Sequence, residues 1–429
     1  MATKYTERDK ECEDSLEAVL NTPGLFTSEA DRDAVTQALR DAYNAAWETI
    51  APFYVRAVHR MLEDVRAAAA RGAIVASVGR DGENVREIVL AFEPGLGIIE
   101  IPLNRSIVRR ALADLKHNHG RAFPDLDAML GTMSWKTISP EEMANAAQNL
   151  KTLLRRLGLP VDEPEPRKDI ILLDNGMRGT ARAALKQMYW PQAKGTLVQG
   201  FYLFRTAAYF DPQPNADRGY LFDLDADTSD GGKNLYVLPD DPDLEGLTFR
   251  AEDALVLIEV LTSGPKLSTD RIDAHGHPVQ RLFRDEPLRE KSINPVRRSA
   301  RYLDPRVYEG VLRTIRAAIG NHARYAARHE QDGADVQELL RPGHERMVKN
   351  TRAWIAGDLD AMHPGLRELA GTYCWTNQWP TIAKLADAIN AAGLSAETAR
   401  TVWAEFDELR DDTARKAFIE RLTSWPTAA

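Results

Sequence analysis

The chain has 429 residues, of which 44% are hydrophobic and 28% charged, the balance of an ordinary globular protein with room for two or three domains. The formal net charge of -9 at pH 7 disfavours nonspecific binding to nucleic acid or to an anionic membrane. Because the two cysteines, Cys12 and Cys374, lie far apart, neither a disulfide scaffold nor a thiolate metal site is expected. No apolar signal core opens the chain and no apolar run reaches the ~18 residues that a bilayer requires, so we expect a cytoplasmic protein.

Apolar residues recur at helical spacing from Asp31 to about residue 70, which predicts helix over that range. The pattern is carried by Leu39, Tyr43, Trp47, Ile50, Tyr54, Val58, Met61, Leu62 and Val65. Gly72 ends the helix, and the apolar runs at 73–78 and 97–102 predict two buried strands. Residues 85–92 between them are expected to be helical, and a polar helix is predicted from about residue 140 to 157.

The second part of the chain begins with a linker-like stretch rich in Pro and Glu at 160–166. Further strands are predicted from Asp169 and over 196–204, so that strands and helices alternate from about residue 71 to 238. The Asp-, Pro- and Gly-rich stretch 211–243 is expected to form loops, and 251–262 is either helix or strand. From about Asp304 onward the pattern is helical throughout.

This order of elements predicts the fold class α/β, with a mostly parallel sheet as its core. An N-terminal helical segment is expected over residues 1–70, an α/β sugar-phosphate-binding core with insertions over 71–300, and a C-terminal all-helical domain over 301–429.

The segment most informative about function is 169–185, with the sequence DIILLDNGMRGTARAAL. It is typical of a buried strand that stops at Asp174, followed by a glycine-bounded loop and a helix that Thr180 opens. Glycines let backbone N–H groups approach an anion, and a helix N-terminus adds partial positive charge, so this pattern favours a phosphate cradle. The carboxylate of Asp174 is available to sugar hydroxyls or to Mg²⁺. The alternative is an ordinary strand-to-helix turn in which Asp or Thr is only a cap.

This segment resembles the phosphoribosyl diphosphate loop of type I phosphoribosyltransferases, which also joins an apolar strand, an acid, a Gly/Thr loop and an Ala-rich helix. The resemblance implies that Asp174 binds ribose, and we take Asp174 as a candidate catalytic residue and metal ligand. The residues that it implies for binding the substrate and its 5-phosphate are Asn175, Gly176, Met177, Arg178, Gly179 and Thr180. The sequence departs from the family in carrying Asn175 at the position of the second acid and in having a shorter loop.

A second loop, Ser77-Val78-Gly79-Arg80-Asp81-Gly82, follows the first strand of the same α/β unit. In phosphoribosyltransferases the corresponding loop contacts pyrophosphate, a task that suits the planar guanidinium of Arg80. Arg80 and Asp81 are therefore candidate catalytic residues, and Gly79 and Gly82 are candidate phosphate-binding residues. The alternative is a Gly-rich turn with solvated charges.

Two further segments are candidate anion contacts at the same edge of the sheet. Arg105 and Ser106 follow the second strand, although an exposed helix cap is the simpler interpretation. Residues 262–266, with Lys266 at their end, are either an anion contact or a surface turn.

The motifs together also resemble bacterial proteins that are filed near haloacid dehalogenase-like hydrolases in surface-polysaccharide loci. The matching elements are Arg80-Asp81-Gly82, Asn104-Arg105-Ser106, the loop 174–180 and Gly200-Phe201-Tyr202-Leu203. Separately, Asp223 and Asp225 follow an apolar run and mimic the Asp-x-Asp motif of a dehalogenase-like phosphohydrolase. There the first Asp accepts a phosphoryl group and the second is a general acid. An acidic solvated loop is the alternative for these two residues.

The sequence therefore favours an enzyme that transfers a 5-phosphoribosyl group from phosphoribosyl diphosphate, with Mg²⁺, to a small-molecule acceptor such as an amino sugar or another natural-product scaffold. Neither nucleic acid nor a membrane is expected as a partner. Two alternatives stay open, a dehalogenase-like phosphohydrolase that uses Asp223 and Asp225, and a noncatalytic sensor of a nucleotide or sugar phosphate.

Overall fold

The structure of the chain is a computed structural model, which describes most of its residues. The described residues are 7–124, 126, 138–163, 167–177, 179–192, 198–206, 216–224, 235–236, 249–285, 299–356, 359–374, 385, 388–389, 391–395, 398–399, 401–402, 405–406, 409 and 412–423.

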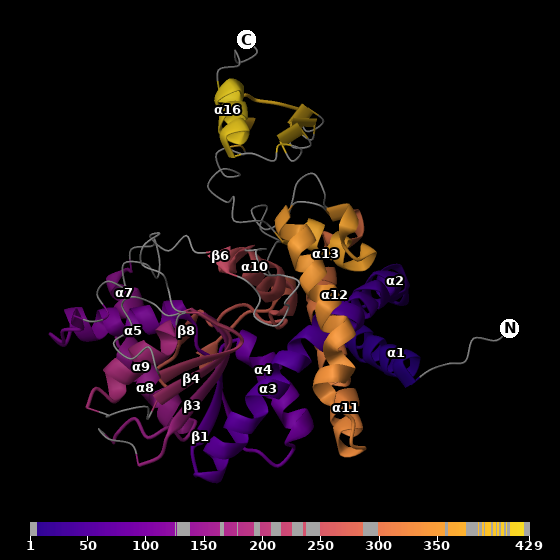
Figure 1. The fold of residues 1–429 in the computed structure, drawn as a ribbon. Helices are drawn as coiled ribbons and strands as arrows, with labels where there is room; N and C mark the ends of the chain where they lie inside the picture. Colours follow the sequence, from indigo (N-terminus) through magenta and orange to yellow (C-terminus); the bar gives the residue numbers. More distant parts are fainter. Residues whose placement is uncertain are drawn as a thin grey trace.

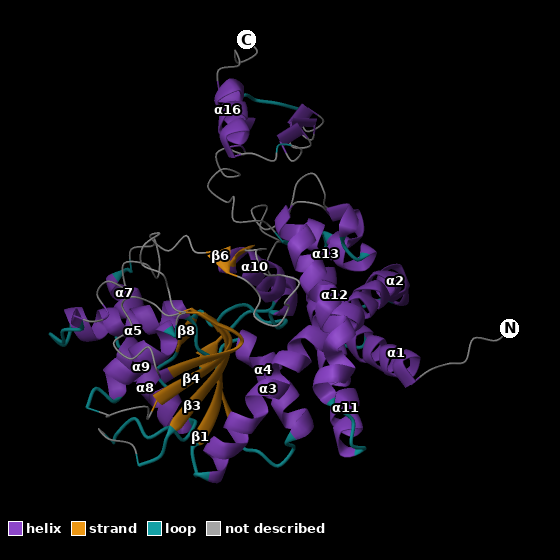
Figure 2. Cartoon of the chain, viewed as in Figure 1, coloured by secondary structure: helices purple, strands orange, loops and turns teal. Residues whose placement is uncertain are grey.

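The centre of the fold is a five-stranded sheet in which every pair of neighbouring strands is parallel (Figure 2). Its strands are β1 (Ile74–Val78), β2 (Ile98–Ile101), β3 (Ile170–Met177), β4 (Val198–Thr206) and β5 (Asp217–Leu224), in the spatial order β2-β1-β3-β4-β5. Two short antiparallel pairs lie outside this sheet, β6 (Leu235–Tyr236) with β7 (Phe249–Arg250) and β8 (Arg271–Ile272) with β9 (Pro278–Val279). The α/β fold class is confirmed.

Helices cover both faces of the sheet because alternate strand residues bury their side chains on opposite sides. Ile170 and Leu172 of β3 belong to one core cluster, and Ile171 and Leu173 belong to another. The first cluster contains residues of α5 (Arg105–His117), α8 (Ala146–Arg156) and α9 (Thr180–Tyr189), with α7 (Pro140–Met143) beside α5. This face is therefore covered by the connections that follow β2 and β3.

The second face is covered by helices from the N-terminal part of the chain and by helices that lie between residues 251 and 373 (Figure 1). The N-terminal ones are α1 (Glu7–Leu20), α2 (Glu29–Ala45), a π-helical turn η1 (Ala46–Ile50) and α3 (Ala51–Ala70). With them pack α4 (Asp81–Phe92), α10 (Ala251–Thr262), α11 (Pro305–Gln331), α12 (Val336–Ala356) and α13 (Pro364–Tyr373). Short 3₁₀ turns lie at Phe283–Asp285, Ala300–Tyr302 and Leu359–Ala361. The helices α1 to α3 and α10 to α13 thus share one core with the sheet.

A third, smaller core lies near the end of the chain, where α16 (Asp412–Thr423) contributes Phe418 and Ile419. In the described part of the chain, no helix combines the length and the apolar character that crossing a membrane would require.

Most predicted elements match, and two differ from expectation. The stretch 211–243, expected to form loops, contains β5, which pairs with β4. Strand β3 does not stop at Asp174 but runs to Met177, because Asp174, Gly176 and Met177 pair in register with β4. The apolar stretch 251–262, whose sequence allows either helix or strand, is the helix α10.

Candidate functional site

The order of strands reverses at β1, and this reversal defines the candidate site. After β1 the chain passes through α4 to β2 on one side of β1, whereas β3 lies on its other side. In open α/β sheets the crevice outside the carboxyl ends of two such strands is the usual ligand site. Residues 79–82 follow β1, with Asp81 as the first residue of α4, and the segment 174–180 follows the part of β3 that pairs with β1, so both predicted motifs lie at this edge.

Asp174 and its neighbour Asn175 point to different surroundings, as successive strand residues must. Asp174 is half-buried, and its carboxylate accepts a hydrogen bond of 2.7 Å from the Asn175 N–H. Asn175 is only 2% exposed, and its Oδ1 accepts a hydrogen bond from the hydroxyl of Tyr54 on α3. Asn175 therefore lies beneath the helical layer, while Asp174 remains accessible at the sheet edge.

Asn175 is part of a buried group of polar side chains that we call the Tyr54 cluster, composed of Tyr54, Ser77, Asn84, Asn175 and Thr262. The Asn84 Nδ2 donates to the Thr262 carbonyl at 2.5 Å, and the hydroxyl oxygens of Tyr54 and Thr262 lie 3.4 Å apart. Three atoms of the cluster, Ser77 Oγ, Asn84 Oδ1 and Asn175 Nδ2, are buried and have no hydrogen-bond partner within the described structure.

Such atoms are costly, since an unpartnered buried polar group loses about 1–3 kcal/mol, and native proteins keep few of them. Here the three atoms come from β1, β3 and α4, and all belong to the switch point. They offer hydrogen-bond donors and acceptors without net charge. These three atoms can therefore form hydrogen bonds with an ordered water molecule or with a neutral polar group of a ligand.

The loop after β1 depends on two glycines. A Cβ at Gly79, whose φ is +66°, would lie 2.7 Å from the Leu103 carbonyl oxygen, and a Cβ at Gly82 would lie 2.8 Å from the Leu173 carbonyl oxygen. Both glycines therefore pack closely against backbone, at Leu103 after β2 and at Leu173 of β3. Between the glycines, Arg80 is half-buried, with its guanidinium 6.0 Å from the centre of the Phe283 ring. Asp81 begins α4, but its side chain lies outside the described residues.

The N-terminus of α9 rests on a buried ion pair. Gly179 precedes the helix with φ +61°, and a Cβ there would lie 2.0 Å from Asp217 Oδ2. The Asp217 carboxylate pairs in turn with Arg182, whose Nε lies 2.6 Å from Oδ1, and both side chains are almost fully buried. The Asp217 carboxylate therefore lies beside Gly179 at the start of α9, with its charge balanced by Arg182. Thr180 is half-buried in the first turn.

Gly176 also has a packing role. Its φ is +105°, and a Cβ would lie 2.1 Å from the Phe204 carbonyl oxygen of β4. Of the remaining predicted loop residues, Met177 ends β3, but its side chain is outside the described residues, as is the whole of Arg178.

Arg105 and Ser106 are exposed in the first turn of α5, where Asn104 is the cap and accepts the Ile107 N–H at 3.0 Å. The segment after α10 crosses the same edge of the sheet, because the Arg80 Nη1 donates to the Lys266 carbonyl at 3.5 Å and Thr269 donates to the Pro102 carbonyl at 2.8 Å. The structure therefore brings residues 262–269 to the loops that follow β1 and β2.

Asp223 lies near the end of β5, an edge strand two positions from β3, and its side chain is not described. Asp225 lies outside the described residues. Asp223 therefore lies two strands away from β3, whereas the switch point lies between β1 and β3.

Within the described part of the chain, no three His, Cys, Asp or Glu side chains are arranged to hold a metal ion. A single half-buried carboxylate, Asp174, nevertheless fits Mg²⁺ that arrives with a phosphorylated substrate, since Mg²⁺ is commonly held by one or two carboxylates together with substrate phosphates.

Sequence reasoning missed Tyr54 and Asn84 as members of the site, and it named Ser77 only as part of the loop motif after β1. Tyr54 fits the apolar periodicity of α3, and only its contact with Asn175, 121 positions away, reveals its second role. Comparison with known proteins adds nothing to this geometry, because no family model, curated protein or solved structure matches the chain.

Proposed function

We propose that this protein is a phosphoribosyltransferase-like enzyme, which transfers the 5-phosphoribosyl group of phosphoribosyl diphosphate to a small-molecule acceptor. The observation that carries the proposal is the switch point between β1 and β3, where the accessible Asp174 and the loop of Arg80 meet at one edge of a parallel sheet. Because residues 169–185 resemble the phosphoribosyl diphosphate loop, we infer that phosphoribosyl diphosphate is the ligand that binds at this edge.

In this proposal each group has one task. Asp174 accepts hydrogen bonds from the ribose hydroxyls and supplies the protein's ligand to Mg²⁺. The backbone amides at Gly179 and Thr180, at the positive end of α9, hold the 5-phosphate. Arg80 offers a planar guanidinium to the departing pyrophosphate, where charge develops and where electrostatic stabilisation contributes most. When bound, Mg²⁺ would neutralise part of the diphosphate charge.

The Tyr54 cluster supports a neutral polar acceptor. Ser77, Asn84 and Asn175 offer both donors and acceptors, which suits a hydroxyl or a carboxamide better than a carboxylate or an ammonium group. An amino sugar presents such hydroxyls, and its ammonium group would then lie outside the cluster. This assignment stays within the small-molecule class that the sequence favours.

The test is calorimetric titration of phosphoribosyl diphosphate with Mg²⁺ into the wild-type protein and into Asp174→Ala. We expect binding to the wild type and a roughly tenfold or larger loss of affinity in the variant, which corresponds to about 1.4 kcal/mol or more. Asp332→Ala, which removes an exposed carboxylate at the end of α11, is the matched control and should bind like the wild type. Absence of binding to the wild type would refute the proposal.

A second candidate, a noncatalytic sensor of the same ligand, is favoured by one observation. The position of the family's second acid holds Asn175, a buried and uncharged side chain whose Oδ1 is engaged by Tyr54. Pyrophosphate release separates the two functions. Release that depends on an added acceptor supports the transferase, and tight binding without release across a broad acceptor panel supports the sensor.

A further inference from the structure

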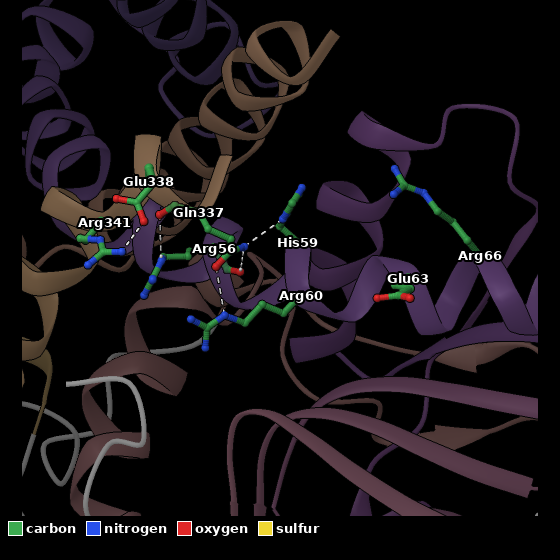
Figure 3. Close-up of a pocket in the computed structure, with 8 residues that line it drawn as sticks. All are labelled: Arg56, His59, Arg60, Glu63, Arg66, Gln337, Glu338 and Arg341. Carbon is green, nitrogen blue, oxygen red and sulfur yellow. Dashed lines mark hydrogen bonds and ion pairs between the residues drawn. The ribbon is translucent and has the colours of Figure 1, made fainter. Parts of the chain in front are cut away.

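The cationic side chains of this protein differ in whether other protein groups already engage them. In the hollow between α3 and α12, Arg341 is ion-paired with Glu338 (Figure 3). Arg56 and Arg60 donate there to the backbone carbonyl and the side-chain Oε1 of Gln337, at 3.1 Å and 3.0 Å, and have further partners. The other cationic residues of this hollow lie in ion-pairing distance of carboxylates as well. Their charges are therefore compensated within the protein, unlike those at the switch point.

A β-hairpin of residues 265–283, which includes β8 and β9, follows α10 and crosses the carboxyl edge of the sheet. It is tied to the loop after β2, because the Asn104 Nδ2 donates to the Thr269 carbonyl at 2.6 Å. Its tip packs on α8, where a Cβ at Gly276 would lie 2.7 Å from the Leu153 nitrogen. The hairpin is thus fixed along its length, and its first residues have a defined place beside the switch point.

The two ends of the hairpin contact the guanidinium of Arg80 through uncharged groups. The Arg80 Nη1 donates to the Lys266 carbonyl at 3.5 Å, and the centre of the Phe283 ring lies 6.0 Å from the guanidinium carbon. Glu83, in the first turn of α4, is paired with Arg316 of α11. In the part of the chain that the structure describes, no carboxylate pairs with Arg80. The positive charge of Arg80 is therefore available to a ligand.

Lys266 adds a second positive charge at the same place. Its side chain is exposed, and none of the described carboxylates forms an ion pair with it. Because its backbone carbonyl lies against the Arg80 guanidinium, its flexible four-carbon side chain starts beside that group. Two neighbouring cations without a carboxylate partner repel each other, and an anion with several charged oxygens would relieve that repulsion.

We propose that Lys266 binds the diphosphate group of phosphoribosyl diphosphate together with Arg80. This inference rests on the proposed function and adds to it a residue from the hairpin, a segment outside the strand-loop-helix units that the family resemblance covers. The planar guanidinium of Arg80 suits two phosphate oxygens at once, whereas the ammonium group of Lys266 acts as a mobile point charge. The hairpin therefore completes the diphosphate end of the site.

The test uses the full chain and three probes, inorganic pyrophosphate, phosphoribosyl diphosphate and ribose 5-phosphate, each titrated by calorimetry with Mg²⁺. In Lys266→Gln we expect a roughly tenfold or larger loss of affinity for the first two probes. Affinity for ribose 5-phosphate, which lacks the diphosphate, should be unchanged. Lys168→Gln is the matched control, since Lys168 is an exposed lysine just before β3, at the opposite edge of the sheet, and it should bind like the wild type. Circular dichroism checks that each variant is folded.

The three probes separate the failure of this inference from the failure of the proposed function. The inference is overturned if the wild type does not bind pyrophosphate, if a folded Lys266→Gln binds it as tightly as the wild type, or if that variant loses affinity for ribose 5-phosphate to the same extent. The proposed function fails in a different way, when the wild type does not bind phosphoribosyl diphosphate. If pyrophosphate binding that depends on Lys266 were then retained, the contact with a diphosphate would stand without the phosphoribosyl transfer.

Discussion

At the scale of single residues, the glycines of the candidate site are explained first by packing. The sequence pattern predicts that Gly176 and Gly179 admit a phosphate, yet each also faces a protein atom that leaves no room for a Cβ. The atom is the Phe204 carbonyl oxygen at Gly176 and the Asp217 carboxylate at Gly179. A glycine in a loop of this kind is therefore not by itself a sign of a ligand.

Gly176→Ala should accordingly destabilise the protein whether or not a ligand binds. The new methyl group would meet the β4 backbone at 2.1 Å, and φ of +105° is strained for any L side chain. We expect the free energy of unfolding, measured by urea denaturation, to fall by about 2–4 kcal/mol. Gly95→Ala, where no atom lies within 4 Å of a Cβ, is the control. Equal stabilities of the two variants would contradict this explanation.

Elements with a clear apolar period could be predicted from the sequence, and those that depend on a distant partner could not. The strands at 73–78 and 97–102 were predictable because they are short apolar runs bounded by Gly and Pro. The extension of β3 through Asp174 to Met177 was not, because polar residues and a glycine interrupt the run and only the register with β4 keeps it extended.

The candidate site follows the same rule. The loops at the ends of β1 and β3 can be located from the sequence, because strand ends and glycines mark them locally. The contacts of Arg56 and Arg60 with Gln337 cannot, since 281 positions separate Arg56 from Gln337. Asn175 can be recognised as a departure from an acid, but its burial under Tyr54 requires the helical layer to be placed.

Two buried histidines on neighbouring helices give the protein a characteristic response to acid. His322 on α11 and His344 on α12 have pKa values lowered to about 3, mainly because burial disfavours the charged ring and secondarily because arginines lie nearby. In the unfolded chain a histidine pKa is about 6.5. Between these values the unfolded state binds more protons, so the stabilisation is complete above about pH 6.5 and is lost as the pH falls toward 3.

Each histidine should contribute up to about 1.4 kcal/mol per pH unit within that window. His344→Phe, which keeps a ring against Phe53, should therefore reduce the loss of unfolding free energy between pH 6 and pH 4 relative to the wild type. Urea denaturation at several pH values measures this slope. The exposed His275→Gln serves as the control and should retain the wild-type slope. A slope in His344→Phe identical to that of the wild type would contradict the prediction.

At the scale of the whole molecule, the N-terminal helix α1 and the end of α13 are part of the same core, whereas α16 belongs to a separate one. Cys12 of α1 and Cys374, which follows α13, are both buried in the cluster that covers one face of the sheet. Burial raises the pKa of Cys12 to about 11 and raises the pKa of Cys374 as well. Both thiols are therefore shielded and protonated in the folded protein, and each reports on the integrity of a different end of the core.

Because these helices share one core, we expect both thiols to become reactive in a single denaturant transition. The single-cysteine variants Cys12→Ala and Cys374→Ala let each remaining thiol be followed separately with a chromogenic thiol reagent at pH 8. The two reactivity curves should coincide with the loss of helical circular dichroism, as for one cooperative unit. If the thiol of Cys12 reacted at a denaturant concentration where that of Cys374 and the helical signal were unchanged, the N-terminal helices would be separable from the rest. The N-terminal helical segment would then unfold as an independent unit, and the shared core would not be cooperative.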